Sequence, residues 1–264
     1  MKSALRTLIA AVALAAFGFA PRARAAETIK LGVENGPHAE IAELVKKIVA
    51  KQGIDLKVFE ISDYAQENPA LAAGDLDINS FQHQPYLDQQ VKDRGYPIVS
   101  VARTIVFPIG LYSKKVKSLD QLPKGARIAI PNDPTNGGRG LLLLQSKGLI
   151  KLKPGSGLSP TPGDIAQNPK KLKIIEADAA QLPHLLPDVD AAIINTNYAI
   201  QGKLDPAKDA IARESADSPY VNVLVVRKAD QEKPWVKKLV AAYHSAEVKS
   251  WILKKYPGVV VPGF

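Results

Sequence analysis

The chain has 264 residues, of which 35 are basic and 26 acidic, a net charge of +9 and no cysteine. The lack of cysteine excludes disulfides, thiolate metal sites, a cysteine nucleophile and a lipid attached through cysteine. The first 25 residues hold four of the basic residues and no acidic one, so the remainder has 31 basic and 26 acidic side chains and a net charge of +5. These charges are scattered along the chain rather than clustered, which argues against nucleic-acid binding.

The N-terminal segment has the pattern of a signal peptide. Lys2 and Arg6 precede an unbroken run of apolar residues and glycine over 8–20. Such a run suits the core of a signal peptide and is shorter than the roughly 20 residues of a membrane-spanning helix. A small-residue cleavage pattern ends at Ala25. We therefore expect residues 1–25 to be removed on export, and the mature protein to be free in the periplasm.

The mature chain opens with a predicted unit of alternating strands and helices. A strand is expected over 28–33, then a polar loop and a helix with one apolar stripe formed by Ile41, Leu44, Val45, Ile48 and Val49. A second strand covers 54–60, a short helix runs from Asn68 to Gly74, and a third strand contains Leu76 and Ile78. This order predicts a parallel sheet flanked by helices.

A second unit of comparable size lies downstream. Its predicted elements are a strand over 127–131, a helix over 139–147, a strand over 172–175, a helix over 179–186 that Pro183 should split, and a strand over 191–194. The Pro- and Gly-rich stretch 151–170 is expected to be a loop. An apolar run over 220–227 and two terminal helices complete the chain.

Two such units in an exported chain predict two α/β lobes that close on a ligand. We expect residues 26–115 together with 218–264 to form the first lobe, and residues 116–217 the second. The chain would then cross between the lobes near 114–119 and return near 215–220. Ligands of open α/β sheets bind beyond the carboxyl ends of the strands. The candidate site therefore consists of the loops at 34–38, 79–86, 132–139 and 195–198.

The segment 79–86 leaves a strand and enters a helix. In an extended chain Phe81 and His83 lie on the same side, and Pro85 at the first helical position brings Tyr86 close to them. The segment then forms an aromatic pocket wall with one polar member. The alternative is a helix cap with two core aromatics, which spacing alone favours.

The segment 132–139 places small residues and Arg139 at an expected helix N-terminus, which suits an anion. Arg139 could add a bidentate contact to a carboxylate. The alternative is a capped helix with a surface arginine. The glycines match neither a P-loop nor a dinucleotide fingerprint.

Two asparagines are further candidates, because Asn197 follows an apolar strand and Asn222 interrupts another apolar run. A buried amide is costly unless it is hydrogen-bonded, so Asn222 either braces the backbone or faces a ligand. His38 beside Glu40 is expected to be part of a solvated helix cap rather than a metal site. We find no catalytic pattern, and expect neither a metal nor a cofactor.

At these same segments the chain resembles the methionine-binding family of ABC-importer substrate-binding proteins, which includes NlpA-type lipoproteins. The matching stretches are spread over nearly all of the mature chain: 34–40, 75–86, 106–110, 129–139, 195–199 and 218–222. The resemblance departs at the mature N-terminus, where many relatives carry a lipidated cysteine and this chain has Ala25 and Ala26.

The resemblance implies a type II periplasmic-binding-protein fold, with two α/β lobes and a ligand cleft between them. It implies a monomer that captures methionine without catalysis and passes it to an importer permease with its ATPase. Another small apolar amino acid or a methionine derivative is the alternative ligand, and an enzyme on the same fold, with His83 in its cleft, is the alternative class. By motif, Phe81, His83 and Tyr86 would surround the thioether with help from Tyr64, Arg139 would hold the carboxylate, and Asn197 and Asn222 would bind the backbone ends of the ligand.

Overall fold

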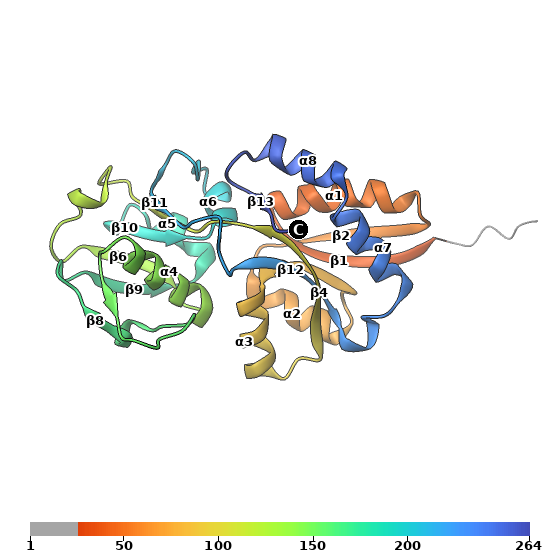
Figure 1. Cartoon of the computed structure of the whole chain (residues 1–264), viewed down its shortest axis with the longest axis horizontal. Helices are drawn as coiled ribbons and strands as arrows, with labels where there is room; N and C mark the ends of the chain where they lie inside the picture. Colours follow the sequence, from red (N-terminus) through yellow and green to blue (C-terminus); the bar gives the residue numbers. More distant parts are fainter. Residues whose placement is uncertain (1–25) are drawn as a thin grey trace, which may run out of the picture.

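The computed structural model describes residues 26–264, so the predicted signal peptide lies outside the described residues. Figure 1 shows two lobes side by side along the long axis of the molecule, each built on its own sheet with helices packed against it. The first lobe contains both the beginning and the end of the described chain, and the second is formed by the middle of the chain. The predicted two-lobed α/β fold is confirmed.

The first lobe has a six-stranded sheet in the order β13-β4-β12-β3-β1-β2. Strands β1, β2 and β3 are parallel, whereas β12 runs antiparallel to β3 and β4, and β13 runs antiparallel to β4. Its elements are β1 (Glu27–Glu34), α1 (Pro37–Ala50), β2 (Ile54–Ile61), α2 (Tyr64–Ala73), β3 (Ile78–His83), α3 (Gln84–Arg94), β4 (Ile98–Val106), β12 (Val221–Arg227), the 3-10 turn η4 (Lys228–Asp230), α7 (Pro234–Tyr243), α8 (Ala246–Lys255) and β13 (Val261–Pro262).

The second lobe has a five-stranded sheet in the order β11-β5-β10-β6-β9 and a separate pair formed by β7 and β8. Strands β6, β9 and β10 are parallel, and β5 runs antiparallel to β10 and β11. Its elements are β5 (Gly110–Tyr112), η1 (Leu119–Gln121), β6 (Arg127–Pro131), α4 (Pro134–Ser146), β7 (Lys151–Leu152), η2 (Pro162–Asp164), β8 (Ile165–Gln167), β9 (Lys173–Ala177), η3 (Ala179–Gln181), α5 (Leu182–Leu185), β10 (Ala191–Ile194), α6 (Thr196–Gln201) and β11 (Ala210–Arg213).

The prediction of a parallel sheet in the first unit was wrong in part, because that sheet is mixed, as is the second. Strand β12 enters the first sheet after the return crossing, and β5 enters the second sheet directly after the first crossing. Neither strand is preceded by a helix of its own lobe that would turn the chain back for a parallel connection. The alternation of strands and helices therefore predicts only the parallel part of each sheet.

The predicted boundary at residue 115 was also wrong. Strand β4 ends at Val106 and β5 already belongs to the second sheet, so the first crossing covers residues 107–109. Phe107 and Ile109 are buried in it. The predicted crossing at 114–119 follows β5 and therefore lies within the second lobe. The return lies between β11 and β12, over 214–220.

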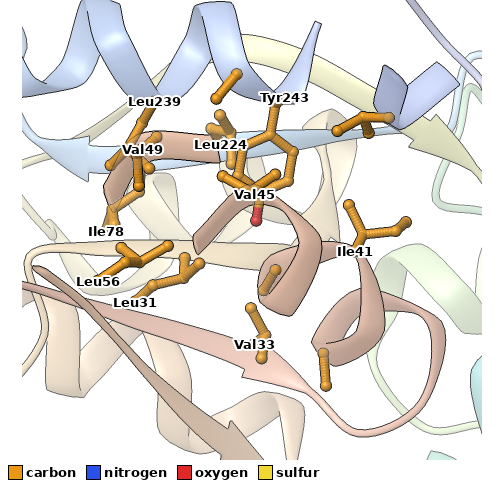
Figure 2. Close-up of a cluster of buried hydrophobic side chains, with 14 of the residues drawn as sticks. Leu31, Val33, Ile41, Val45, Val49, Leu56, Ile78, Leu224, Leu239 and Tyr243 are labelled. Atoms are coloured by element: carbon orange, nitrogen blue, oxygen red, sulfur yellow. The ribbon is translucent and has the colours of Figure 1, made fainter. Parts of the chain in front are cut away.

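One apolar face of the first sheet is covered by α1 and α7. Figure 2 shows Val45 and Val49 of α1 and Leu239 of α7 over Leu31 and Leu224 of the sheet, all fully buried. The apolar stripe that the sequence predicts for α1 is the face that packs here. This packing fixes β1 and β3, whose carboxyl ends lead to the site.

Helix α2 begins at Tyr64, four residues before the predicted start at Asn68. Asp63 is the N-cap, and its carboxylate accepts a hydrogen bond of 2.8 Å from the N–H of Ala65. Pro69, which suggested a first helical turn, instead lies inside the helix. The earlier start matters because it puts Tyr64 in the first turn, where its ring reaches the pocket between the lobes.

Leu224 lies in β12 between β3 and β4 and is fully buried, so Leu224→Ala should leave a cavity in the core of the first lobe. We expect the free energy of unfolding to fall by about 2–5 kcal/mol. Urea denaturation followed by circular dichroism measures the loss. Leu253→Ala is the matched control, because that side chain is 51% exposed and its removal should change little. Equal stability of the two variants would contradict this packing.

Candidate functional site

A pocket lies where the two lobes meet and encloses about 350 Å³ that is not filled by protein atoms, part of it open to solvent. The structure brings all seven residues of the predicted site into its lining: Tyr64, Phe81, His83, Tyr86, Arg139, Asn197 and Asn222. Five further lining residues were not predicted: Gln82, Phe107, Asn136, Asn195 and Thr196. Apart from Phe107, these lie in the loops that were predicted to form the site.

Three aromatic rings of the first lobe form one wall of the pocket. The ring centroid of Tyr64 lies 5.8 Å from that of Phe81 and 6.2 Å from that of Tyr86, and the last two are 5.9 Å apart. The rings come from α2, β3 and α3, which meet at the carboxyl end of β3. Such a cluster offers an apolar, polarisable surface that suits a thioether or an alkyl chain.

His83 is both a helix cap and part of the pocket wall, so both interpretations of its segment hold. Its Nδ1 accepts a hydrogen bond of 3.1 Å from the N–H of Tyr86 at the start of α3. The proton therefore lies on Nε2, which donates to Oδ1 of Asn136 in the second lobe at 3.1 Å. Burial, helped by the nearby charge of Arg139, lowers the pKa of His83 to about 3. The ring is neutral near pH 7.

Arg139 is the one ionised side chain among the lining residues. It is 3% exposed, and an ion pair with Glu214 holds it through Nε and Nη2. Nη2 also donates to the carbonyl oxygen of Phe107 at 2.7 Å, and the guanidinium lies 4.5 Å from the ring centroid of Tyr220. Nη1 makes no hydrogen bond with another described residue, so the free edge of the guanidinium is available to an anion.

The helix that carries Arg139 starts earlier than predicted, so the interpretation of Arg139 as a residue at a helix N-terminus was wrong. Helix α4 begins at Pro134, and Arg139 lies in its second turn. Asp133 caps the helix, and its carboxylate accepts from the N–H of Asn136 at 2.9 Å. The backbone donors expected to bind an anion are therefore engaged by the protein itself. Gly138 serves packing instead, since a Cβ there would lie 2.6 Å from the Cα of Ser159.

Asn222 lies in β12 directly across from His83 of β3. Its Nδ2 is 3.0 Å from Nε2 of His38 and 3.5 Å from the carbonyl oxygen of Phe81. The prediction that His38 belongs to a solvated cap was wrong, because the ring is 3% exposed. His38 follows Pro37 at the start of α1, where the turn from β1 directs it inward beneath β12, and sequence spacing does not reveal this direction.

Hydrogen bonds between the lobes surround the pocket. Asn197 of the second lobe donates through Nδ2 to Glu34 and accepts from the hydroxyl of Tyr64 at 2.7 Å. Nearby, the hydroxyl of Tyr198 donates to the carbonyl oxygen of Ser62 at 3.1 Å. Both groups of the Asn197 amide thus bind the first lobe. Asn197 lines the pocket and also ties the two lobes together.

A family model described as NlpA lipoprotein matches residues 29–264. The chain belongs to the NlpA lipoprotein family. It is 52% identical to the "D-methionine-binding lipoprotein MetQ" of Escherichia coli strain K12, over 89% of this chain and 88% of that protein.

Solved structures of similar proteins have the same fold. A nutrient-binding protein from Burkholderia cenocepacia, solved bound to methionine, is 58% identical with a TM-score of 0.87, over 89% of this chain and all of that one. An ABC-transporter periplasmic substrate-binding protein from Coxiella burnetii is 48% identical with a TM-score of 0.85, over 89% of this chain and 99% of that one. In this NlpA-family chain no helix among residues 26–264 is long and apolar enough to cross a membrane.

Two carboxyl groups of this NlpA-family protein are buried beside the site. Glu34 ends β1 and is 1% exposed, and burial together with the nearby Glu67 raises its pKa well above 4.5. Burial also raises the pKa of Glu67 well above 4.5, and neither oxygen of Glu67 has a hydrogen-bond partner in the described structure. Each carboxyl group is therefore more costly to ionise in the folded protein than in the unfolded chain.

This arrangement predicts a stability that depends on pH. A raised pKa means that the folded protein keeps the Glu67 proton after the unfolded chain has lost it, so the free energy of unfolding falls as the pH rises above about 4.5. The lowered pKa values of His38 and His83 act in the opposite direction. Below pH 6.5 the unfolded chain binds protons that the buried rings do not, so the free energy of unfolding falls as the pH decreases. We expect the melting temperature to be highest between these two values.

Glu67→Gln tests the acidic part of this prediction. The variant has no carboxyl group to ionise at this position. Relative to the original protein, its free energy of unfolding should therefore increase as the pH rises from 5 to 8, by up to about 1.4 kcal/mol per pH unit. Its melting temperature should increase in the same direction. Calorimetric melting over this range measures the difference. Glu232→Gln is the matched control, because its side chain is 81% exposed. If the free energy of unfolding of Glu67→Gln differs from that of the original protein by the same amount at every pH, the carboxyl group of Glu67 is not buried in its neutral form.

Proposed function

We propose that this protein captures methionine in the pocket between its lobes and delivers it to an ABC importer. The observation that carries the proposal is that one pocket combines the three-ring cluster with the free edge of Arg139. Methionine needs both, an apolar surface for its thioether and a cation for its carboxylate. The relatives support the same ligand, since one carries methionine in its name and another was solved bound to it.

Within the pocket we propose a distinct part for each group. Tyr64, Phe81 and Tyr86 surround the thioether side chain, with His83 completing the wall. Arg139 binds the carboxylate through Nη1. The amides of Asn222 and Asn197 bind the backbone ends of the ligand, and Asn197 also holds the lobes closed over it.

The site favours binding over catalysis. His83 was the only candidate for proton transfer, and both of its ring nitrogens are engaged by Tyr86 and Asn136. Burial lowers its pKa to about 3, so the ring is neutral near pH 7 and has no imidazolium proton to give as a general acid. Among residues 26–264 no carboxylate hydrogen-bonds to the ring and orients it in the way typical of a general base. We therefore propose a binding protein without catalytic activity.

We further propose that the protein works in the periplasm as a monomer and docks on a permease driven by an ATPase. The signal-peptide pattern of residues 1–25 supports export, and the similar protein from Coxiella burnetii is described as periplasmic. The chain has no cysteine that could carry a lipid, unlike the relatives that are named lipoproteins. Membrane attachment would then depend on the permease.

Calorimetric titration of ligand-stripped protein with L-methionine, D-methionine, norleucine and leucine tests the ligand assignment. We expect methionine to bind most tightly. Norleucine, which lacks the sulfur, should bind roughly 2- to 12-fold more weakly, because a sulfur–aromatic contact contributes about 0.3–1.5 kcal/mol. If methionine gives neither heat nor a thermal shift while another amino acid gives both, methionine is the wrong ligand.

Arg139→Ala tests the carboxylate site. The variant removes the one cation of the lining, and the N-terminus of α4 offers little substitute because Asp133 already caps it. Loss of a charge-assisted hydrogen bond costs about 1.5–3 kcal/mol, so methionine affinity should fall roughly 10- to 150-fold. Arg94→Ala, which removes an exposed arginine, is the matched control. An affinity that Arg139→Ala leaves unchanged would exclude this residue from the site.

A further inference from the structure

His38 is buried behind the pocket and is not one of its lining residues. The ring packs edge-on against Phe107, with centroids 5.1 Å apart, and its Nε2 lies 3.0 Å from Nδ2 of Asn222. Phe107 and Asn222 both line the pocket. His38 therefore contacts two members of the site without facing the ligand space itself.

The contacts of Asn222 fix which end of its amide faces His38. The carbonyl oxygen of Phe81 can only accept a hydrogen bond, and it lies on the same side of the amide at 3.5 Å. The NH₂ group must therefore point toward Phe81 and His38. His38 then accepts through Nε2 and carries its proton on Nδ1. Burial lowers the pKa of His38 to about 3, so the ring stays neutral and keeps this acceptor near pH 7.

The other end of the amide is left for the pocket. No described residue donates a hydrogen bond to Oδ1 of Asn222, while Nδ2 is engaged. Among the lining residues no carboxylate is available for a ligand ammonium group. An oriented amide oxygen is the kind of acceptor that such an ammonium group needs.

We propose that His38 is a positioning residue that holds Asn222 with its oxygen toward the ligand and thereby selects ligands with an α-amino group. The inference rests on the proposed function and deepens it. The ligand amine is then recognised by the neutral amide of Asn222, which His38 orients, and no carboxylate is needed. Without His38, the Asn222 amide can rotate and present its NH₂ group, which repels an ammonium donor.

The test compares two substitutions and two ligands. His38→Leu removes the acceptor, and His38→Gln keeps one, because a glutamine oxygen can accept from Nδ2 of Asn222. The ligands are L-methionine and 4-(methylthio)butanoate, which is methionine without its amine. We expect His38→Leu to weaken methionine roughly 10-fold or more and to leave the amine-free ligand within about 3-fold, whereas His38→Gln stays near the original protein for both.

Asn222→Ala provides the second half of the test. If His38 acts through Asn222, adding His38→Leu to Asn222→Ala should cause no further loss of methionine affinity. Equal losses for both ligands in His38→Leu, or losses that add in the double variant, would overturn the proposal in favour of a packing role. Melting temperatures of the ligand-free variants show which of them fold.

A measurement on the unsubstituted protein keeps the proposal testable if His38→Leu does not fold. Nitrogen NMR of histidine-labelled protein reports which ring nitrogen of His38 carries the proton. We expect Nδ1, and a proton on Nε2 would overturn the proposal. If the original protein fails to bind methionine, the proposed function is wrong and the inference falls with it. If methionine binds but His38→Leu binds it equally well, only the inference is wrong.

Discussion

The buried guanidinium of Arg139 is the interaction on which the rest of the site depends. A cation that is 3% exposed must be compensated by oxygens or by an aromatic ring. The compensation comes from both segments that cross between the lobes: the carbonyl oxygen of Phe107 belongs to the first, and Glu214 and Tyr220 belong to the second. The group that we propose to bind the ligand carboxylate is thus held by the segments about which the lobes would move.

The remaining polar side chains of the pocket lining are neutral, and several of them are oriented by a partner. His83 is fixed between the N–H of Tyr86 and Oδ1 of Asn136, and Asn136 is held in turn by Asp133. Asn222 is fixed by His38. Oriented amides can recognise a ligand that carries both charges without burying a further ion, which would be costly in this enclosed place.

The contacts that hold the lobes together suit a pocket that has to open. They include hydrogen bonds of amides and hydroxyls, such as those of Asn197 with Tyr64 and of His83 with Asn136. A hydrogen bond between neutral groups contributes only about 0.5–1.5 kcal/mol net, because water replaces the partner when the bond opens. A few such bonds favour the closed form and still allow ligand exchange by hinge movement.

The sequence by itself determined the two-lobed α/β class and the seven predicted residues that line the pocket, because apolar periodicity and the family-like stretches are local features of the chain. Only the tertiary structure decided the direction of β12 and β5, the crossing at 107–109, the burial of His38 and the pairing of Arg139 with Glu214. Each of these joins residues far apart in the chain: 75 positions separate Arg139 from Glu214, and 184 separate His38 from Asn222. No spacing rule reaches across such distances, and the partner of a buried polar group is set by which strand ends the fold brings together.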